Sequence, residues 1–218
     1  INKNSLIFNL FDNVNTSKYL YKVNIDFNPF YSKLQGNTKE IDLSTLFNSN
    51  ALLAELLKSE ILNNINLNFN LDINANKFRK YQGFNDIFLN SKIKEGLIDI
   101  DNTKFDWKDY AKFKILDSLI HVKNSELVLD GKLEIIIKNS QEIYKTLLTP
   151  KNYRTEIKKI ELNFNYNFDQ KILKLNDIRV DNVINKNIGN ILKNLIVRSD
   201  KLQNKIYFKN MINKAIKS

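Results

Sequence analysis

The sequence predicts a mainly β fold: a long, curved antiparallel meander sheet with one apolar face, shaped as an open half-barrel or groove, with a few helices. Two long alternations carry this prediction, at residues 65–78 and 160–168, where apolar residues alternate with Asn, Asp or Glu. Successive side chains of a strand point to opposite faces, so each alternation places its apolar residues on one face of a sheet. A helix would scatter the same residues around its circumference.

Composition removes several classes of function. The 218 residues include no Cys, which excludes disulfides, thiol chemistry and thiolate metal sites. The five glycines are scattered, so they form no phosphate-binding loop or dinucleotide fingerprint. The 34 Lys and Arg residues are interleaved with 24 acidic residues. This pattern indicates a solvated surface, with a diffuse preference for anionic lipid as the alternative, and not a nucleic-acid arm.

The N-terminal region predicts three strands. Residues 6–11 form a short apolar segment, and residues 21–27 alternate until Asn28-Pro29, where Pro lacks a backbone donor. Residues 30–34 are expected to return as the hairpin partner and to end at Gly36-Asn37.

A helix is predicted at residues 50–62. Ser49 or Asn50 can cap it, and leucines recur inside it at helical spacing. We expect it to pack on an edge or end of the sheet. Asn63-Asn64 ends it, and the long strand is expected to begin at Ile65.

The central region predicts neighbouring antiparallel strands across residues 87–138. A turn is expected at Glu95-Gly96, and a strand containing Phe105 and Trp107 precedes a break at residues 108–109. Residues 113–122 form another extended candidate. Residues 127–129 are predicted to pair with 133–137 as a hairpin across Asp130-Gly131, because Asp-Gly is a strong turn signal.

The C-terminal region mixes strands and helices. A short helix is expected at residues 140–148 with Ser140 as its cap, followed by strands at 160–168 and 172–183 and a bulge at Asn176-Asp177. Helical segments are predicted over 184–216, where Ile184, Ile191 and Leu195 belong to an aliphatic stripe. No linker or repeat divides residues 1–218, so we predict a single domain.

No catalytic, metal or cofactor site is predicted, and the chain is expected not to be an enzyme. His121 is the only histidine and has no acid-rich setting in the sequence. Asp99, Asp101, Asp106 and Asp109 lie close together in the chain. Paired carboxylates can serve acid–base chemistry or bind a hard cation, but alternate acids on a strand usually form its solvated face.

Several phrases carry a family resemblance, in this order: KSEILNNINLNFNLDINANKF, LNSKIKEGLIDIDNTKFDW, LVLDGKLEIIIKN, LLTPKNYRTEIKKIELNFNYNF and FKNMINKAIKS. Together they resemble the C-terminal region of the AsmA-like proteins of Gram-negative bacteria, from about Asp42 onward. One departure is Glu95-Gly96, where many relatives carry Asn-Gly.

The resemblance implies a location and a role. AsmA-like proteins are attached to the inner membrane by an N-terminal helix, extend into the periplasm, and are similar to bridge-like lipid-transfer proteins linked to outer-membrane biogenesis. This chain begins with Ile and contains no apolar run of the ~18–20 residues that span a bilayer as a helix. We therefore expect a periplasmic fragment of a longer chain, joined to the membrane through a segment outside these residues.

The predicted function is a non-enzymatic lipid-binding or lipid-bridging module that holds phospholipid or other acyl chains on the apolar face. Nucleic acid and cofactors are not expected as partners. The alternative is a structural or interaction domain that pairs with an envelope protein through its open sheet edge, without lipid. Helices 50–62 and 184–216 could instead cover the face and leave a full core. The predicted lipid-facing residues are Ile65, Leu67, Phe69, Leu71, Ile73, Leu133, Ile135, Ile137, Leu162, Phe164, Tyr166 and Phe168.

Overall fold

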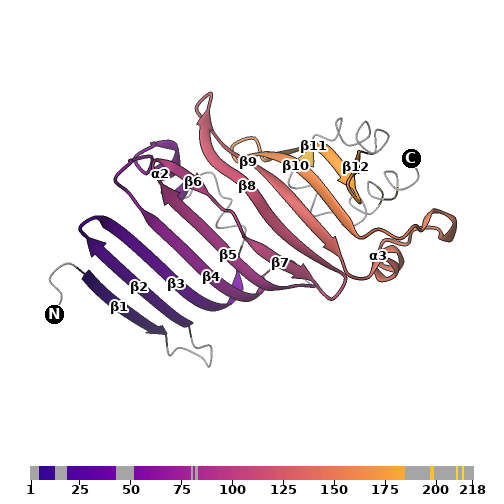
Figure 1. Ribbon diagram of the computed structural model, residues 1–218, viewed down its shortest axis with the longest axis horizontal. Coiled ribbons are helices and arrows are strands. Elements are labelled where there is room, and N and C mark those ends of the chain that lie inside the picture. The colour runs from indigo at the N-terminus through magenta and orange to yellow at the C-terminus, as the bar shows by residue number, and fades with distance from the viewer. Residues whose placement is uncertain are drawn as a thin grey trace.

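The computed structural model describes residues 5–12, 19–42, 52–79, 81, 83–184, 197–198, 210 and 213. Within them, thirteen strands form one sheet that extends along the longest axis of the molecule (Figure 1). The strands are β1 (Ser5–Asp12), β2 (Tyr19–Phe27), β3 (Phe30–Ile41), β4 (Phe69–Phe78), β5 (Phe84–Lys94), β6 (Leu97–Asp99), β7 (Lys104–Trp107), β8 (Ala111–Lys123), β9 (Glu126–Ile137), β10 (Lys159–Asn167), β11 (Ile172–Val180), β12 (Val183–Ile184) and β13 (Val197–Arg198).

The strand order follows the chain, which confirms the predicted meander. The order is β1-β2-β3-β4-β5-β6-β8-β9-β10-β11-β12, while β7 pairs with β5 and β8, and β13 pairs with β11. All of these pairs are antiparallel except β3 with β4, which is parallel. A parallel pair needs a crossover connection, and this one contains helix α2 (Leu52–Lys58).

Three aspartates produce bulges in the long strands. Asp86, Asp117 and Asp177 have φ angles of 50°, 48° and 49°, and the pairing register shifts at each of them. Asp tolerates this left-handed conformation better than most residues. Each extra residue resets the alternation, so that Ile87 and Ile178 become buried. The predicted bulge at Asn176-Asp177 is confirmed.

Strands β6 and β7 occupy one position between β5 and β8, and the break between them is closed by side chains. The Thr103 hydroxyl donates to the Asn90 carbonyl (2.9 Å) and accepts from the Asn90 N–H (3.1 Å). The Ser118 hydroxyl accepts from the Ile100 N–H (2.9 Å). The Asp101 carboxylate accepts from both the N–H (2.7 Å) and the hydroxyl (2.6 Å) of Ser118. These bonds replace missing ladder bonds in the middle of the sheet.

The predicted hairpin across Asp130-Gly131 is wrong. Strand β9 runs unbroken through both residues, and the turn lies earlier, at Asn124 and Ser125, whose φ angles are 52° and 63°. Two consecutive positive φ angles are the requirement of a type I′ hairpin turn. Strand β3 likewise continues through Gly36 to Ile41, so the predicted strand end at Gly36-Asn37 is also wrong.

These two glycines make room for aromatic rings. Gly131 is paired with Phe164 and Gly36 with Tyr21 on the neighbouring strand. A Cβ atom would lie 2.8 Å from the Phe164 ring at position 131, and 2.6 Å from the Tyr21 ring at position 36. The absence of a side chain therefore lets each ring lie against the backbone of the next strand.

The substitution Gly131→Val is expected to lower the free energy of unfolding by roughly 1–3 kcal/mol, because its side chain would overlap the Phe164 ring. Urea unfolding followed by circular dichroism measures this change. The double variant Gly131→Val/Phe164→Leu should recover part of the loss. Equal stability of wild type and Gly131→Val would contradict the assigned contact.

The helices differ from the predictions in their bounds. Helix α2 (Leu52–Lys58) ends at residue 58 and not at 62, while predicted positions 50 and 51 lie outside the described residues. Strand β4 begins at Phe69, so Ile65 and Leu67 precede it. Helix α3 (Ser140–Leu147) is capped by the Asn139 side chain, which accepts from the Glu142 N–H (3.1 Å), and not by Ser140. A short 3-10 helix follows at Lys151–Tyr153.

The predicted helical region 184–216 falls mostly outside the described residues. Ile184 belongs to β12, and Val197 and Arg198 form β13, so these three positions are strand and not helix. Residues 185–196, which carry the rest of the aliphatic stripe, lie outside the described part of the chain.

Candidate functional site

A single row of apolar residues crosses the sheet from β1 to β11. The register joins each member to its neighbour on the next strand, and side chains paired in this way lie on the same face. Nine of its ten members are apolar, the exception being Ser32. We call it the apolar row: Leu6, Ile25, Ser32, Phe69, Ile93, Ile98, Ile120, Leu129, Tyr166 and Leu173.

Burial of this apolar face changes along the sheet. Leu129 and Ile98, near the middle, are each 4% exposed. On the outer strands, Leu6 is 46% exposed, Phe8 47% and Phe27 53%. The face is therefore covered at its centre and open to solvent over β1 and β2.

Helix α2 covers one end of the central strands. Ala54 packs in one buried cluster with Leu127, Leu129 and Phe168, and Leu57 packs against that cluster. Aromatic rings fill the opposite end of these strands. Phe105 lies 5.0 Å from Phe113, 5.5 Å from Phe78 and 5.6 Å from Phe84, measured between ring centroids.

The twelve predicted lipid-facing residues are brought together only in part. Phe69, Leu71 and Ile73 lie in β4, and the six from Leu133 to Tyr166 lie in β9 and β10. Phe168 directly follows β10 and is buried beneath α2. Ile65 is 75% exposed and precedes β4, as does Leu67, so the predicted row begins four residues too early. The predicted lipid-facing residues include none from β1 and β2, whose shorter alternations carry the most exposed part of the face.

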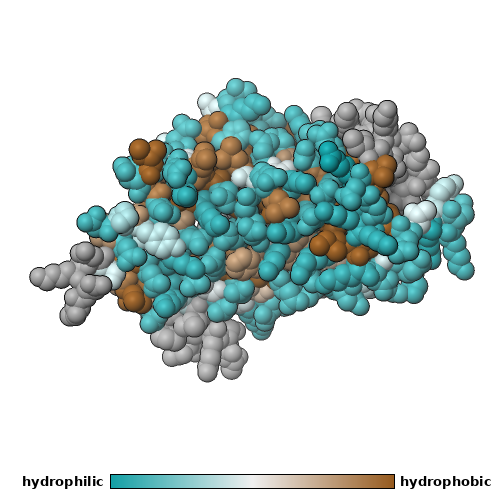
Figure 2. Space-filling model, in the orientation of Figure 1, coloured by the Kyte–Doolittle hydropathy of each residue, from teal (hydrophilic) through white to brown (hydrophobic). Residues whose placement is uncertain are grey.

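The opposite face is polar and held by ion pairs. Asp72 joins Lys33 (3.2 Å) to Asn90 (2.7 Å) across β3, β4 and β5. Lys132 pairs with Glu161 (3.2 Å) across β9 and β10. The face turned towards the viewer in Figure 2 is mostly hydrophilic, with scattered apolar residues. The ion pairs of these strands thus lie on one side of the sheet and the apolar row on the other.

His121 has an acidic partner that the sequence did not reveal. Its Nε2 lies 2.8 Å from Asp130 Oδ2, and Asp130 Oδ1 accepts from the Asn165 amide (2.8 Å). Burial alone would raise the pKa of Asp130, but the hydrogen bonds from Asn165 and His121 hold it below its usual value. Within the described strands no hydroxyl group is hydrogen-bonded to His121, so this pair lacks the nucleophile of a hydrolase triad.

The four neighbouring aspartates do not converge. Asp101 is used by Ser118, and Asp106 pairs with Lys138 at 2.5 Å. Burial raises the pKa of Asp99, and Asp109 is exposed. Among the described residues no group of three or more His, Cys, Asp or Glu side chains could hold a metal ion.

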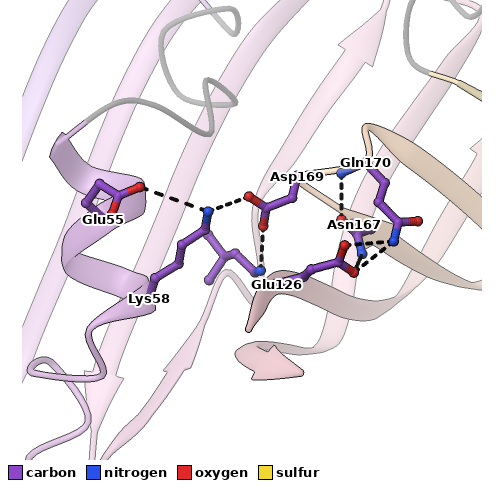
Figure 3. Close-up of polar contacts among 7 residues, drawn as sticks. Glu55, Lys58, Glu126, Asn167, Asp169 and Gln170 are labelled. Atoms are coloured by element: carbon purple, nitrogen blue, oxygen red, sulfur yellow. Dashed lines mark hydrogen bonds and ion pairs between the residues drawn. The ribbon is translucent and has the colours of Figure 1, made fainter. Parts of the chain in front are cut away.

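A polar anchor fixes α2 to the sheet (Figure 3). Lys58 of α2 forms an ion pair with Asp169, in the turn after β10. Asp169 also accepts from the Leu127 N–H (2.8 Å), which ties it to the start of β9. Beside it, Glu126 accepts from the side-chain amides of Asn167 (2.7 Å) and Gln170 (2.8 Å). This contact could not be predicted from local sequence, because 111 residues separate Lys58 from Asp169.

The α2 anchor should weaken in acid. Burial would raise the pKa of Asp169, but the bonds from Lys58 and Leu127 hold it below its usual value. A lowered carboxyl pKa stabilises the folded state above the ordinary carboxyl range, and this stabilisation is lost as pH falls through the lowered value. The hydrogen bond to Asp169 raises the pKa of Lys58, so the same contact should persist until strongly alkaline pH. Glu55 and Glu126 lie near Lys58 and favour its charged form.

Hydrogen exchange checks this expectation. Amide protection in α2 should fall on going from pH 5 to pH 3, relative to the central residues of β9. Asp169→Asn removes the titrating group, so its α2 should already be weakly protected at pH 5 and change little below it. Equal pH dependence of α2 protection in wild type and variant would contradict the assignment.

Comparison of the chain with protein-family models, with curated proteins and with solved structures finds no match. Of the helices that the structure describes, none has the length and apolar character needed to cross a bilayer.

Proposed function

We propose that this chain is a non-enzymatic module that holds the acyl chains of phospholipids or related lipids on the apolar face of its sheet. The observation that carries the proposal is the apolar row, which crosses ten strands and has one polar member. An apolar sheet face requires a second layer to cover it. The outer strands leave bulky side chains such as Phe8 and Phe27 about half exposed on that face.

An acyl chain fits this surface in size and chemistry. Neighbouring strands lie ~4.8 Å apart, so the distance from β1 to β5 is roughly 19 Å, which is on the order of one extended acyl chain. Each methylene group that leaves water contributes roughly 0.8 kcal/mol. Along this path the row offers an aliphatic or aromatic side chain on every strand except β3, where its member is Ser32, while the ion pair of Lys33 with Asp72 lies on the other face.

The resemblance to AsmA-like C-terminal regions supports the same proposal and extends it. It would place the domain in the periplasm, attached to the inner membrane through a segment outside these residues. The lipid would then be phospholipid, and the role would be in outer-membrane biogenesis.

Adjacent residues on β1 provide the experiment. Phe8 is on the apolar face, paired with Val23, while Ile7 is paired with Asn24 on the polar face and is 63% exposed. Phe8→Asp should weaken the binding of a fluorescent fatty acid at least tenfold, whereas the matched control Ile7→Asp should leave it unchanged. Native mass spectrometry of gently purified protein should also detect co-purified phospholipid. Absence of both signals in wild type would refute the proposal.

The second candidate function is pairing through the β1 edge. Strand β1 ends the strand order, and its sequence SLIFNLFD contains no Lys or Pro, the residues that commonly protect an edge. Such an edge can add a strand from a partner protein. Sedimentation analysis that finds self-association abolished by Ile7→Lys, in a protein without bound lipid, would favour this alternative.

A further inference from the structure

The connection between β3 and β4 crosses the apolar face. Its helix α2 lies in sequence between two adjacent strands, yet its buried residues pack on β8, β9 and the end of β10. In the sheet, β5 and β6 separate β4 from β8. The connection therefore extends from β3 to β8 and β9, where α2 packs, before the chain comes back to form β4 beside β3. We call residues 52–68 the strap.

The described apolar contact between the strap and the buried cluster involves Ala54 and Leu57. Ala54, at 6% exposed, contributes only a methyl group to the buried cluster, and Leu57 is partly buried. Three other large side chains whose burial the structure describes are exposed: Leu52 is 77% exposed, Leu56 37% and Ile61 68%. Hydrophobic stabilisation follows the apolar area removed from water, so these three exposed side chains add little to the attachment.

The ion pair between Lys58 and Asp169 supplies the specific attachment. Its acceptor is also bonded to the sheet, because the Leu127 N–H donates to the Asp169 carboxylate (2.8 Å). Beyond Lys58, the clearest further contact is between Asn63 and the Gly96 turn, where a Cβ atom at position 96 would lie 2.7 Å from the Asn63 carbonyl oxygen. Among the described residues, the strap is thus held at this turn by close backbone packing, and at α2 by the packing of Ala54 and Leu57 and by the charge-assisted hydrogen bond of Lys58.

We propose that the strap is a releasable cover: rupture of the Lys58–Asp169 ion pair lifts α2 from Leu127, Leu129 and Phe168 and exposes that part of the apolar face. One of these residues, Leu129, belongs to the apolar row. Entry of an acyl chain there rests on the proposed function. Opening of the strap does not depend on the proposed function, and it can be measured without lipid.

Thiol reactivity measures the opening, because the chain has no native cysteine. The thiol of Ala54→Cys reports on the strap, and that of Ala75→Cys, at a site 4% exposed in a different buried cluster, reports on the rest of the sheet. Lys58→Met keeps the length of the side chain and removes its charge. It should raise the N-ethylmaleimide reaction rate at position 54 roughly tenfold, the effect of losing one charge-assisted hydrogen bond, and leave position 75 unchanged.

Equal acceleration at both positions, or none at position 54, would overturn the proposal. Leu57→Cys repeats the measurement if the larger side chain at position 54 itself displaces the helix. Asp169→Asn keeps an oxygen for the Leu127 N–H and should reproduce the effect of Lys58→Met.

Binding of a fluorescent fatty acid then tests whether an acyl chain occupies the surface that the released strap exposes. Lys58→Met should increase the amount bound at saturation, and saturating fatty acid should accelerate the thiol reaction at position 54 in the otherwise unaltered chain. Release of the strap without fatty-acid binding in any variant would support the cover and overturn the lipid function. Fatty-acid binding that Lys58→Met leaves unchanged, with no acceleration at position 54, would overturn the cover alone.

Discussion

Replacing Leu129 with Asp is expected to cost roughly 3–5 kcal/mol of folding free energy, because it places a charge beneath α2 with no partner to compensate it. Leu129 is 4% exposed and belongs to both the apolar row and the cluster around Ala54. Urea unfolding followed by circular dichroism measures the loss. Leu129→Ala, which removes volume without adding charge, should cost less.

An Asp substitution on the open part of the face, at Phe8, distinguishes an open groove from a fully packed core. Phe8→Asp should change the free energy of unfolding by less than about 1 kcal/mol, because its 47% exposure lets water reach the carboxylate. If Phe8→Asp destabilised the protein as much as Leu129→Asp, the outer strands would be as buried as the centre. The full-core alternative would then be correct.

Local alternation predicted the strands and not their connections. The alternating residues of β4 and β10 identified both strands, because a period of two needs no information from elsewhere in the chain. The same reasoning found the bulge near Asp177, where the apolar phase slips. The bulges at Asp86 and Asp117 escaped it, since a single Asp inside an apolar stretch also occurs in ordinary exposed positions.

Turn chemistry misled the prediction at one place for a physical reason. Asp-Gly favours a type I′ turn, but Gly131 lies inside β9 because Phe164 on β10 occupies the space that its side chain would fill. Local sequence cannot show a neighbour that is more than 30 residues away. The α2 anchor escaped prediction for the same reason, since it joins Lys58 to the turn after β10, which is 111 residues away in the chain.

Sequence reasoning placed the apolar face but not its exposure. Alternation shows which residues share a face, whereas burial depends on what covers that face. A parallel pairing of β3 with β4 was not expected, and its crossover brings α2 over β8 and β9. The open part of the face accordingly lies over β1 and β2, whereas the predicted lipid-facing residues lie mainly on β4, β9 and β10.

The last prediction concerns Asp101, which joins the break between β6 and β7 to β8. Asp101→Ala should lower the free energy of unfolding by roughly 2–3 kcal/mol, because the N–H and hydroxyl of Ser118, a residue only 7% exposed, lose their shared acceptor. Urea unfolding gives the change in stability, and hydrogen exchange at the Ser118 amide should accelerate by more than exchange in β10.

Two matched variants complete this test. Asp101→Asn retains an acceptor oxygen and should cost about 1 kcal/mol or less. Asp109→Ala removes an exposed carboxylate from the same acidic stretch and should stay within about 0.5 kcal/mol of wild type. Equal losses for Asp101→Ala and Asp109→Ala would mean that the Ser118 contacts contribute nothing measurable. A large loss confined to Asp101→Ala would show that this aspartate stabilises the break in the sheet, as its hydrogen bonds indicate.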